Sequence, residues 1–286
     1  MLVFSGSKSA GLAKRVSEES RIKLGETELR KFTDGEFYIR ILSGVKNENA
    51  VLINSVVDNE SLVETLLLLD ALRDNGAKRI DLFVPYMAYC RQDKVFKDGE
   101  ALSAKTVLKL LGNFSDSITT LNAHFLDTYG RFEPWGVKLK NLDAFPLLAK
   151  HFAGRVRSPV VIAPDKGAMH YARNAAEIIG CESDYLEKTR VSDTDVRMKT
   201  KKLPVKGKDV IILDDIISTG GTMLKAAGML RGAGAKTIDL GCVHGVFSKG
   251  TEMFGGVVDE LVCTDSIERT ESRVSVSGLI AGEIQK

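Results

Sequence analysis

One segment of this chain occurs twice, as Leu72-Arg-Asp-Asn-Gly-Ala-Lys-Arg-Ile-Asp-Leu82 and again as Leu230-Arg-Gly-Ala-Gly-Ala-Lys-Thr-Ile-Asp-Leu240. Each copy contains a glycine of the kind that ends a helix and then runs into residues typical of a strand. An apolar run precedes each copy, at 50–53 and at 210–213, and is followed by a loop and a stretch with helical periodicity. The pattern predicts two strand–loop–helix–strand units.

Strands that alternate with helices favour a parallel sheet with helices on its faces, joined by right-handed connections. The two copies begin at residues 72 and 230, about one domain length apart. We therefore predict an α/β protein with two related domains, each a mainly parallel sheet flanked by helices. The alternative is chance similarity at the end of a helix, because Gly-Ala-Lys before a strand is a common sequence.

The boundary between the two domains is expected after the stretch 135–141. There the periodic pattern lapses, and Pro134 and Gly136 interrupt the chain. The predicted domains are therefore residues 1–141 and 142–286. The total of 286 residues also suits two domains of ordinary size.

A second irregular stretch, residues 187–209, carries 12 charged side chains among its 23 residues. It is too polar to pack into a core and long for a plain connection in a compact domain. Either it is a solvated hairpin, or it is a lid that carries cations over an anionic substrate. Composition alone favours the solvated hairpin.

Composition and charge exclude several classes of protein. The hydrophobic share of 44% and the charged share of 27% are those of a globular protein, and no apolar run approaches the roughly 18–20 residues of a membrane span. Forty Lys and Arg against 38 Asp and Glu leave a net charge of +2, so no overall attraction to nucleic acid or anionic lipid is expected.

The cysteines and the N-terminus give no sign of export. Cys90, Cys181, Cys242 and Cys263 are far apart and form no CxxC pair, which fits neither a disulfide framework nor a zinc cluster. The first residues lack the basic and long apolar regions of a signal peptide. We therefore expect a cytoplasmic protein without a targeting segment.

The strongest candidate site follows the apolar run before the second copy. Its sequence is Val210-Ile-Ile-Leu-Asp-Asp-Ile-Ile-Ser-Thr-Gly-Gly-Thr222, and helical periodicity begins directly after it. The start of a helix offers free backbone N–H groups and the positive end of the helix dipole to an anion. Two glycines let the backbone curl around an oxyanion, and three hydroxyl side chains supply donors: Gly220, Gly221, Ser218, Thr219 and Thr222. The sequence predicts a phosphate site here.

Asp214 and Asp215 precede this loop and suit ribose hydroxyls or a hydrated Mg²⁺. The loop matches neither a Walker A motif nor a dinucleotide fingerprint. The alternative is an ordinary turn between strand and helix with a threonine N-cap. In the first copy the equivalent loop, 56–61, has no glycine and carries carboxylates that would repel phosphate. We therefore expect phosphate to bind in the second copy alone.

The strand, the paired aspartates and the Thr-Gly-Gly-Thr turn together resemble the phosphoribosyl diphosphate loop of type I phosphoribosyltransferases. Further motifs narrow the resemblance to the ribose-phosphate diphosphokinases, which make phosphoribosyl diphosphate from ribose 5-phosphate and ATP. These motifs are Phe32-Thr-Asp-Gly-Glu36, Pro85-Tyr86 with Arg91-Gln92-Asp93, His124, Pro164-Asp165 and Lys188-Thr-Arg190. They follow the family's order over nearly the whole chain, whose length resembles that of the shorter archaeal members. The two-domain, duplicated fold of the family agrees with the internal repeat.

The resemblance implies an ATP site in the first domain. Phe32, Asp34 and Glu36 would form an adenine-binding loop that reaches into the ATP site of a neighbouring subunit, which implies a homo-oligomer of at least two chains. Arg91 and Gln92 would line the ATP phosphates and adenine. From the residues alone, the Asp-Gly loop is a β-turn and Arg91 is a solvated side chain.

The resemblance also implies a metal, a lid and a ribose 5-phosphate site. His124 would assist a Mg²⁺ that bridges ATP oxygens, and Asp165 would hold a second metal or the ribose, although a lone histidine is more often structural. Lys188 and Arg190 would be catalytic cations, which makes the charged stretch a lid. The ribose 5-phosphate site would comprise Asp214, Asp215, Ser218, Thr219, Gly220, Gly221 and Thr222.

Three residues depart from the family pattern. Ser218 stands where the family loop usually has Asp, Lys166 follows Asp165 where a small residue is usual, and Thr189 separates the two lid cations. Lys166 could pair with the neighbouring carboxylate and perturb metal binding.

Three classes of function remain open at this point. A phosphoribosyltransferase would need one such domain and no adenine loop, and a non-catalytic homologue would be expected to lose the loop glycines or the lid cations. The chain keeps all of these features. We therefore expect a Mg²⁺-dependent transferase that acts on ATP and ribose 5-phosphate and binds neither nucleic acid nor membrane.

Overall fold

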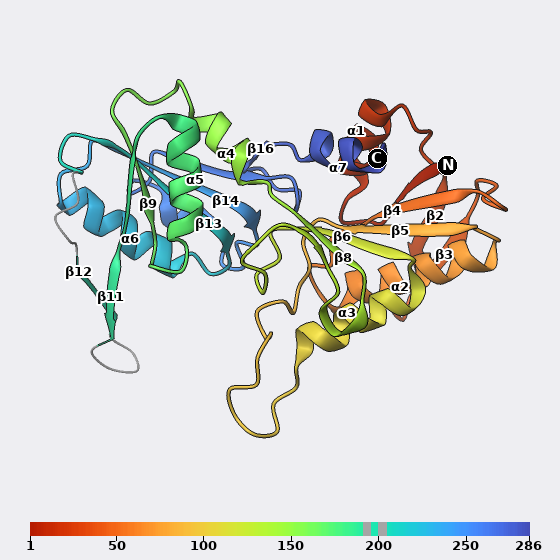
Figure 1. The fold of residues 1–286 in the computed structure, drawn as a ribbon. Coiled ribbons are helices and arrows are strands. Elements are labelled where there is room, and N and C mark those ends of the chain that lie inside the picture. The colour runs from red at the N-terminus through yellow and green to blue at the C-terminus, as the bar shows by residue number, and fades with distance from the viewer. Residues whose placement is uncertain (191–195, 200–204) are drawn as a thin grey trace. The chain divides into compact units, whose positions relative to one another are not determined.

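The computed structural model describes residues 1–190, 196–199 and 205–286, with the backbone alone at 188–190 and 196–199 (Figure 1). The chain divides into two compact units. The first comprises Met1–Asp143 together with Ser266–Glu268 and Ser275–Lys286. The second comprises Ala144–Asp265 together with Arg269–Val274.

The first unit contains a six-stranded sheet in the order β1-β4-β5-β6-β8-β7. Neighbouring strands are parallel, except that β7 runs antiparallel to β8 at the edge. The strands are β1 (Leu2–Ser5), β4 (Asn49–Ile53), β5 (Arg79–Val84), β6 (Ser117–Leu121), β7 (Gly130–Phe132) and β8 (Leu139–Leu142). The helices are α1 (Ala10–Ser20), α2 (Asn59–Asp74) and α3 (Ser103–Phe114), and β2 (Thr27–Lys31) forms a hairpin with β3 (Phe37–Ile41).

The second unit contains a parallel sheet in the order β10-β9-β13-β14-β15-β16. The strands are β9 (Pro159–Ala163), β10 (Glu182–Tyr185), β13 (Asp209–Ile217), β14 (Thr237–Gly245), β15 (Glu260–Thr264) and β16 (Ser272–Val274). The helices are α4 (Phe145–Phe152), α5 (Met169–Ile179) and α6 (Gly221–Gly232). A separate antiparallel pair joins β11 (Glu187–Arg190) to β12 (Val196–Lys199). The predicted α/β class, with mainly parallel sheets flanked by helices, is confirmed.

The repeat found in the sequence corresponds to equivalent positions in the two sheets. Ala50 pairs with Ile80 in the first unit, and Val210 pairs with Ile238 in the second. Both predicted helix-ending glycines, Gly76 and Gly234, have a positive φ, of 85° and 89°. The next N–H donates back across each helix end, from Ala77 to Leu72 O at 3.1 Å and from Ala235 to Leu230 O at 3.0 Å. Two matching strand pairs and two matching helix ends are more than chance similarity explains.

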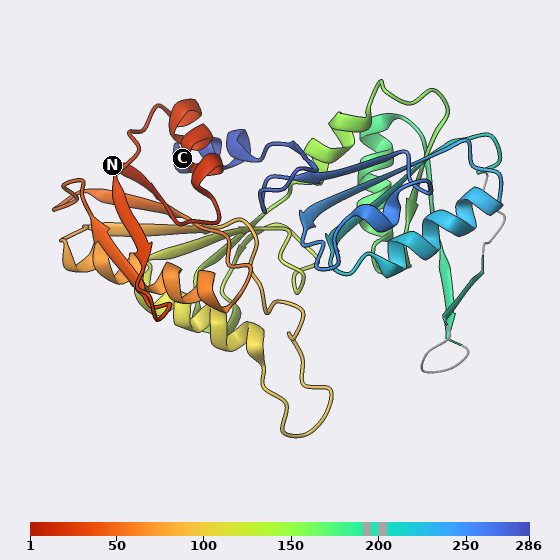
Figure 2. The ribbon, with the colours of Figure 1, turned by 180° about the vertical axis from the view of Figure 1, so that it is seen from behind.

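In each half, the short helix that follows the last strand of the sheet belongs to the other unit. β8 leads into α4, which belongs to the second unit, whereas β16 leads into α7 (Ser277–Ile284), which belongs to the first. Helix α7 lies beside α1 in both ribbon views (Figure 2), where Gln285 Nε2 donates to Ser20 O at 3.1 Å. The second domain predicted from the sequence, residues 142–286, includes α7. The sequence could not show that this helix belongs to the first unit, because no local pattern reports which sheet a terminal helix covers.

The stretch expected to link the domains is structured in two places. Pro134–Gly136 forms a short 3₁₀ turn, and Leu139–Leu142 is strand β8 of the first sheet. The change of unit falls just after it, between Asp143 and Ala144. The periodic pattern lapses there because the four residues of β8, Leu-Lys-Asn-Leu, do not alternate between apolar and polar.

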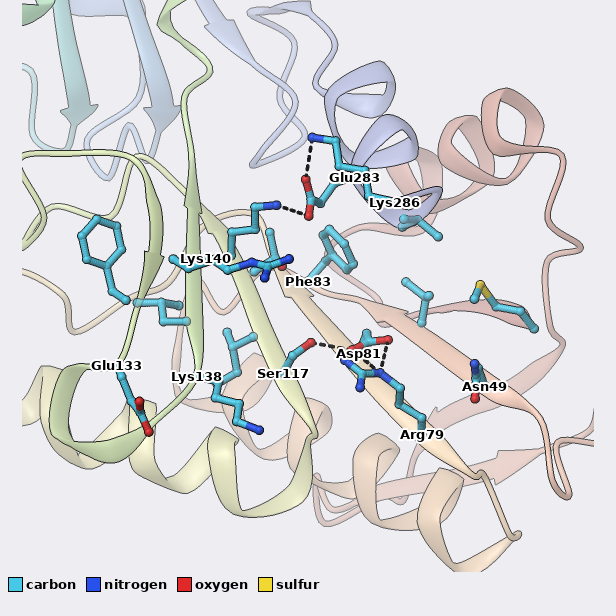
Figure 3. Close-up of a pocket in the computed structure, with 18 residues that line it drawn as sticks. Asn49, Arg79, Asp81, Phe83, Ser117, Glu133, Lys138, Lys140, Glu283 and Lys286 are labelled. Atoms are coloured by element: carbon cyan, nitrogen blue, oxygen red, sulfur yellow. Dashed lines mark hydrogen bonds and ion pairs between the residues drawn. The ribbon is translucent and has the colours of Figure 1, made fainter.

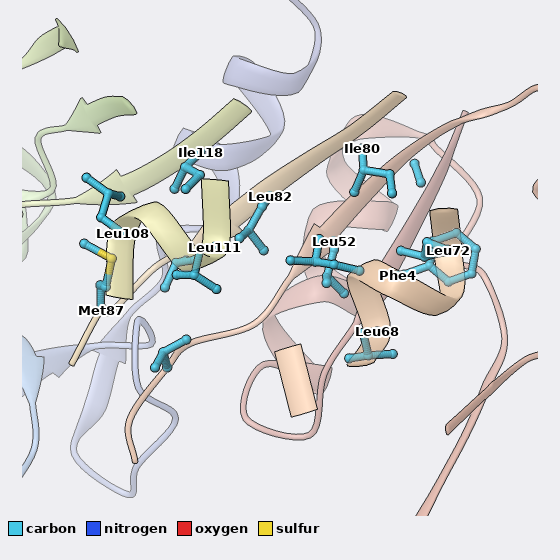
Figure 4. Close-up of a cluster of buried hydrophobic side chains, with 14 of the residues drawn as sticks. Phe4, Leu52, Leu68, Leu72, Ile80, Leu82, Met87, Leu108, Leu111 and Ile118 are labelled. Atoms are coloured by element: carbon cyan, nitrogen blue, oxygen red, sulfur yellow. The ribbon is translucent and has the colours of Figure 1, made fainter. Parts of the chain in front are cut away.

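The core of the first unit lies between its sheet and helices α2 and α3 (Figure 4). Phe4 and Leu52 of the strands cluster with Leu68 and Leu72 of α2, and all four side chains are fully buried. Such a core holds the strands rigidly and leaves the loops at their ends free to vary. No helix in the described part of the chain is long and apolar enough to cross a membrane.

The repeat places one aspartate at the same point of each sheet, in contrasting surroundings. Asp81 on β5 accepts hydrogen bonds from Arg79 Nε at 2.9 Å and Nη2 at 2.7 Å, and lies opposite Ser117. Asp239 on β14 lies opposite Glu260 instead. Burial, together with the charges of Glu260, Asp259 and Asp209, raises the pKa of Asp239 from 3.8 to about 6.

This contrast predicts opposite effects of one substitution in the two halves. Folded Asp239 keeps its proton between about pH 4 and 6, whereas the unfolded chain loses it, so this residue makes stability fall as pH rises through that window. Asp239→Asn should therefore be more stable than the wild type at pH 7.5, by about 1–2 kcal/mol after allowing for solvent near the carboxylate. The gain should vanish below about pH 4.

Asp81→Asn is the matched control. It removes a charge-assisted contact with Arg79 and should lower stability at pH 7.5 by about 1 kcal/mol. Urea unfolding at pH 4, 6 and 7.5 measures both changes. An Asp239→Asn variant whose stability relative to the wild type does not change with pH would contradict the interpretation.

Candidate functional site

The predicted phosphate loop joins the centre of the second sheet to helix α6. Strand β13 continues through Asp214 and Asp215 to Ile217, beyond the apolar run that predicted it. Ser248 N–H donates to Ser218 O at 2.9 Å and so anchors the start of the loop. Residues 218–222 thus lie at the carboxyl end of a central strand, where α/β sheets bind ligands.

Gly220 gives the loop its shape. Its φ is +78°, and it is the N-cap of α6, so a threonine does not cap this helix. A Cβ atom at this position would lie 2.7 Å from Phe254 Cζ and 3.0 Å from Met253 Sδ, whereas one at Gly221 would meet nothing within 4 Å. Among the described residues no side chain caps α6, and its first turn has no acidic residue. Its first backbone N–H groups are therefore open to an anion.

The equivalent helix of the first unit is closed by the chain's own carboxylate. Asp58 Oδ1 accepts a hydrogen bond from Ser61 N–H at 2.7 Å, and Ser61 completes a capping box. Burial acts against the ionised form, but the hydrogen bonds from Ser61, together with the charge and hydrogen bond of Lys8, outweigh it and lower the pKa of Asp58. A carboxylate thus occupies the position that an anion would take in the second unit.

Three carboxylates lie beside the phosphate loop. Asp215 is 7% exposed. The pKa of Asp214 is raised well above its ordinary value, chiefly by burial and then by the charges of Asp215 and Asp165. Asp165 follows β9, which pairs with β13, and its Oδ1 accepts from Ala168 N–H at 3.2 Å. Crowded carboxylates of this kind favour a bound cation or sugar hydroxyl donors.

The described residues contain no group of three or more His, Cys, Asp or Glu side chains placed to enclose a metal. Mg²⁺ in phosphoryl-transfer sites usually keeps waters and substrate oxygens and takes only one or two protein carboxylates. The carboxylate group around Asp214 therefore fits Mg²⁺ that arrives with a phosphate substrate.

The predicted ATP residues of the first unit follow two neighbouring strands. Arg91 and Gln92 lie in the loop after β5, and His124 follows β6, which pairs with β5. Arg91 and His124 are exposed and Gln92 is half-buried. The His124 loop is held by Ala123 N–H, which donates to Asn141 Oδ1 at 2.9 Å. The fold thus brings these two loops to one edge of the first sheet.

The loop Phe32–Glu36 is the tip of the β2–β3 hairpin. Phe32 N–H donates to Glu36 O at 2.8 Å, and Gly35, with φ of 96°, takes the turn position that needs glycine. Phe32 is 46% exposed, and the Arg30 guanidinium lies 4.9 Å from its ring centre. The loop is therefore a β-turn, and it also presents an aromatic ring and two exposed carboxylates, Asp34 and Glu36.

Lys188 and Arg190 lie in strand β11, opposite Met198 and Val196 of β12. The stretch expected to be irregular thus contains an antiparallel strand pair, which extends away from the second sheet (Figure 1). The side chains of both cations, and residues 191–195 and 200–204, lie outside the description.

A cavity of about 710 Å³ lies in the first unit, at the end of the sheet away from the predicted ATP residues (Figure 3). Its lining includes Asn49, Arg79 and Ser117, the first residues of β4, β5 and β6, and the ion pair of Lys140 with Glu283 of α7. Ligands of α/β sheets bind at the carboxyl ends of strands, so this cavity is separate from the candidate site. Its lining comes from many separate elements, so no local sequence pattern predicts it.

Two similar α/β halves, of which one leaves the start of its central helix uncapped by any described side chain, are typical of the phosphoribosyltransferase class of folds. Residues 140–265 match the phosphoribosyl transferase domain, and residues 1–114 match the N-terminal domain of ribose phosphate pyrophosphokinase. The chain belongs to the ribose-phosphate pyrophosphokinase family, another name for the diphosphokinases that its motifs resemble.

Relatives match the chain over nearly its full length. Ribose-phosphate pyrophosphokinase 2 of Archaeoglobus fulgidus is 42% identical over 96% of this chain and 96% of its own. The ribose-phosphate pyrophosphokinase of Pyrococcus furiosus is 40% identical over 96% and 97%. The crystal structure of phosphoribosylpyrophosphate synthetase from Mycobacterium smegmatis is 28% identical, with a TM-score of 0.83 over 99% of this chain and 97% of that chain.

The two loop glycines should respond differently to substitution. Gly220→Ala forces a Cβ against Phe254 and a side chain into a left-handed conformation, which should cost about 2 kcal/mol and lower the melting temperature by several degrees. Gly221→Ala meets no neighbour, so its melting temperature should stay close to that of the wild type. Its methyl group would still narrow the anion site, so calorimetry should show weaker ribose 5-phosphate binding. Equal melting temperatures for the two variants would contradict this account of Gly220.

Proposed function

We propose that the protein is a ribose-phosphate diphosphokinase. It transfers the β,γ-diphosphoryl group of ATP to the C1 hydroxyl of ribose 5-phosphate and releases AMP and 5-phosphoribosyl 1-diphosphate. The observation that carries this proposal is the open N-terminus of α6 behind the Gly220 turn, beside Asp214 and Asp215. The full-length similarity to ribose-phosphate pyrophosphokinases supports it.

The ribose 5-phosphate site is the loop of the second unit. The 5-phosphate binds the backbone N–H groups at the start of α6, with hydroxyl donors from Ser218, Thr219 and Thr222. Asp214 and Asp215 bind the ribose hydroxyls. A sugar hydroxyl beside Asp214 can also share the proton that its raised pKa favours.

The ATP site is built on the first unit. Arg91 neutralises phosphate charge, and Gln92 contacts the adenine. Phe32, Asp34 and Glu36 complete the adenine pocket of a neighbouring subunit, so the active form is a homo-oligomer of at least two chains. The exposed tip of the β2–β3 hairpin supports this role, because an aromatic ring that is 46% exposed is available to a partner.

We include Mg²⁺ in the proposal. His124 would assist an ion bound to the ATP phosphates, and Asp165 would hold a second ion or contact the ribose. The first ion would offset the phosphate charge of ATP. The four cysteines, all free, are in keeping with the reducing cytoplasm that we propose as the location.

Transfer needs positive charge at the β-phosphoryl group. The C1 hydroxyl attacks the β-phosphorus in line with the departing AMP oxygen, so negative charge spreads over the β-phosphoryl oxygens. Lys188 and Arg190 supply cations there when the charged stretch closes as a lid. The strand pair that carries them is compatible with an arm of this kind.

The reaction itself is the first test. Purified protein with Mg²⁺, ATP and ribose 5-phosphate should yield AMP and phosphoribosyl diphosphate in equal amounts, and no AMP should form without ribose 5-phosphate. Chromatography of the nucleotides measures both. Release of ADP in place of AMP would rule out diphosphoryl transfer, and consumption of added phosphoribosyl diphosphate with a free base would favour a phosphoribosyltransferase.

The lid is tested by Lys188→Ala. Loss of one transition-state donor costs about 2–4 kcal/mol, which lowers kcat by roughly 10²–10³. The KM values of both substrates should change little. Lys206→Ala, which removes an exposed cation from the same charged stretch, is the control and should keep the wild-type kcat. A raised KM with unchanged kcat would make Lys188 a binding residue instead.

A further inference from the structure

The side chain of Gln92 has both of its N–H donors engaged within its own loop. Its Nε2 donates to Lys94 O at 3.0 Å and to Glu100 Oε2 at 3.3 Å. A backbone carbonyl and an ionised carboxylate can only accept hydrogen bonds. The amide must therefore turn its nitrogen toward both partners, and its oxygen Oε1 is left to bind a ligand.

Glu100 is built into the loop by several contacts. Its Oε2 also accepts from Phe96 N–H at 2.8 Å and Lys97 N–H at 3.1 Å. The hydrogen bond from Phe96 N–H, and after it the bond from Lys97 N–H, hold the pKa of Glu100 below its ordinary value. The carboxylate therefore stays ionised at neutral pH and cannot itself donate to Gln92.

The backbone around Gln92 is fixed as well. Gln92 N–H donates to Tyr89 O at 3.1 Å, and Gln92 O accepts from Ala104 N–H, in the first turn of α3, at 3.2 Å. The position of the side chain is thus set by its own backbone bonds, and its orientation by Lys94 and Glu100. A rigid amide of this kind can discriminate between ligands that donate and ligands that accept.

We propose that Glu100 is a positioning residue that fixes the Gln92 carboxamide as a hydrogen-bond acceptor, and so selects a purine nucleotide with an amino group at position 6. This inference rests on the proposed function, which sets Gln92 against the base of ATP. Adenine carries a 6-amino donor, whereas hypoxanthine and guanine carry a 6-oxo acceptor. A 6-oxo purine would face Gln92 Oε1 with two acceptors opposed and no hydrogen bond formed.

The test compares ATP with ITP, which differ at position 6. The wild-type protein should have a clearly higher kcat/KM for ATP than for ITP, with ribose 5-phosphate and Mg²⁺ saturating. Glu100→Ala frees the amide to rotate and should lower the ATP:ITP ratio of kcat/KM by about tenfold, the worth of one hydrogen bond to a fixed group. Asp98→Ala, which removes an exposed carboxylate from the same loop, should keep the wild-type ratio.

A double-mutant cycle separates positioning from a general effect on the loop. In Gln92→Leu the ratio should already be low, and adding Glu100→Ala should change it no further, because Glu100 acts through Gln92. Glu100→Gln keeps an acceptor oxygen for the two backbone N–H groups but also offers Gln92 a donor, so it should lower the ratio by a smaller factor. This variant serves if Glu100→Ala does not fold.

The outcomes are distinct. An unchanged ATP:ITP ratio in Glu100→Ala, a further fall in the Gln92→Leu background, or a wild-type protein indifferent to ATP and ITP would overturn the proposal. Failure of the wild type to form AMP would instead reject the proposed function. Calorimetric binding of ATP and ITP to the wild type and to Glu100→Ala then gives the same comparison without turnover.

Discussion

The candidate site depends on one uncapped helix end. Helix α6 begins at Gly221 with backbone N–H groups that no described side chain satisfies, and Gly220 makes this possible by turning the chain with a φ of +78°. No side chain can replace this glycine without displacing Phe254 and Met253, which fill the space that a Cβ would need. The hydrophobic core of the second unit therefore sets the position of the N–H groups that face an anion, and burial in the core helps to offset the cost of leaving them without a partner.

The two halves have equivalent helix starts, at α2 and at α6. Within the described part of the chain, only the start of α2 is capped by a side chain. Asp58 caps α2 from within, so the first unit gains stability where the second leaves its helix N–H groups uncapped by any described side chain. The sheets show a contrast in the same direction at their other ends. Asp81 is matched by Arg79, whereas Asp239 lies opposite Glu260 with its pKa raised. Equivalent backbone positions thus have different charge environments in the two halves, and the same fold accommodates both.

Periodicity and glycines predicted the parallel sheets, the helix ends at Gly76 and Gly234 and the glycine turn before α6, since all of these are local in the sequence. Features that depend on contacts between residues distant in the sequence could not be predicted. Which sheet α7 covers depends on packing against α1, and the cavity beside Arg79 draws on many separate elements. The Asp239–Glu260 contact depends on strand register. Glu100 could have been suspected, because a carboxylate eight residues after Gln92 can close a loop, but nothing in the sequence fixes which donors it meets.

A net charge of +2 is compatible with the two polyanionic substrates proposed above, because oriented dipoles can supply much of the attraction. Backbone N–H groups at a helix start act over a few ångströms and add nothing to net charge. Local hydrogen bonding also explains how a carboxylate, Glu100, can lie in a loop proposed to bind ATP. A bare carboxylate near a triphosphate would be repulsive, but this one accepts bonds from Phe96, Lys97 and Gln92, so its charge is largely compensated where the nucleotide would bind. Lys94 and Lys97 on the same loop act in the same direction. In the proposed sites, local hydrogen bonding thus matters more than net charge for binding phosphate.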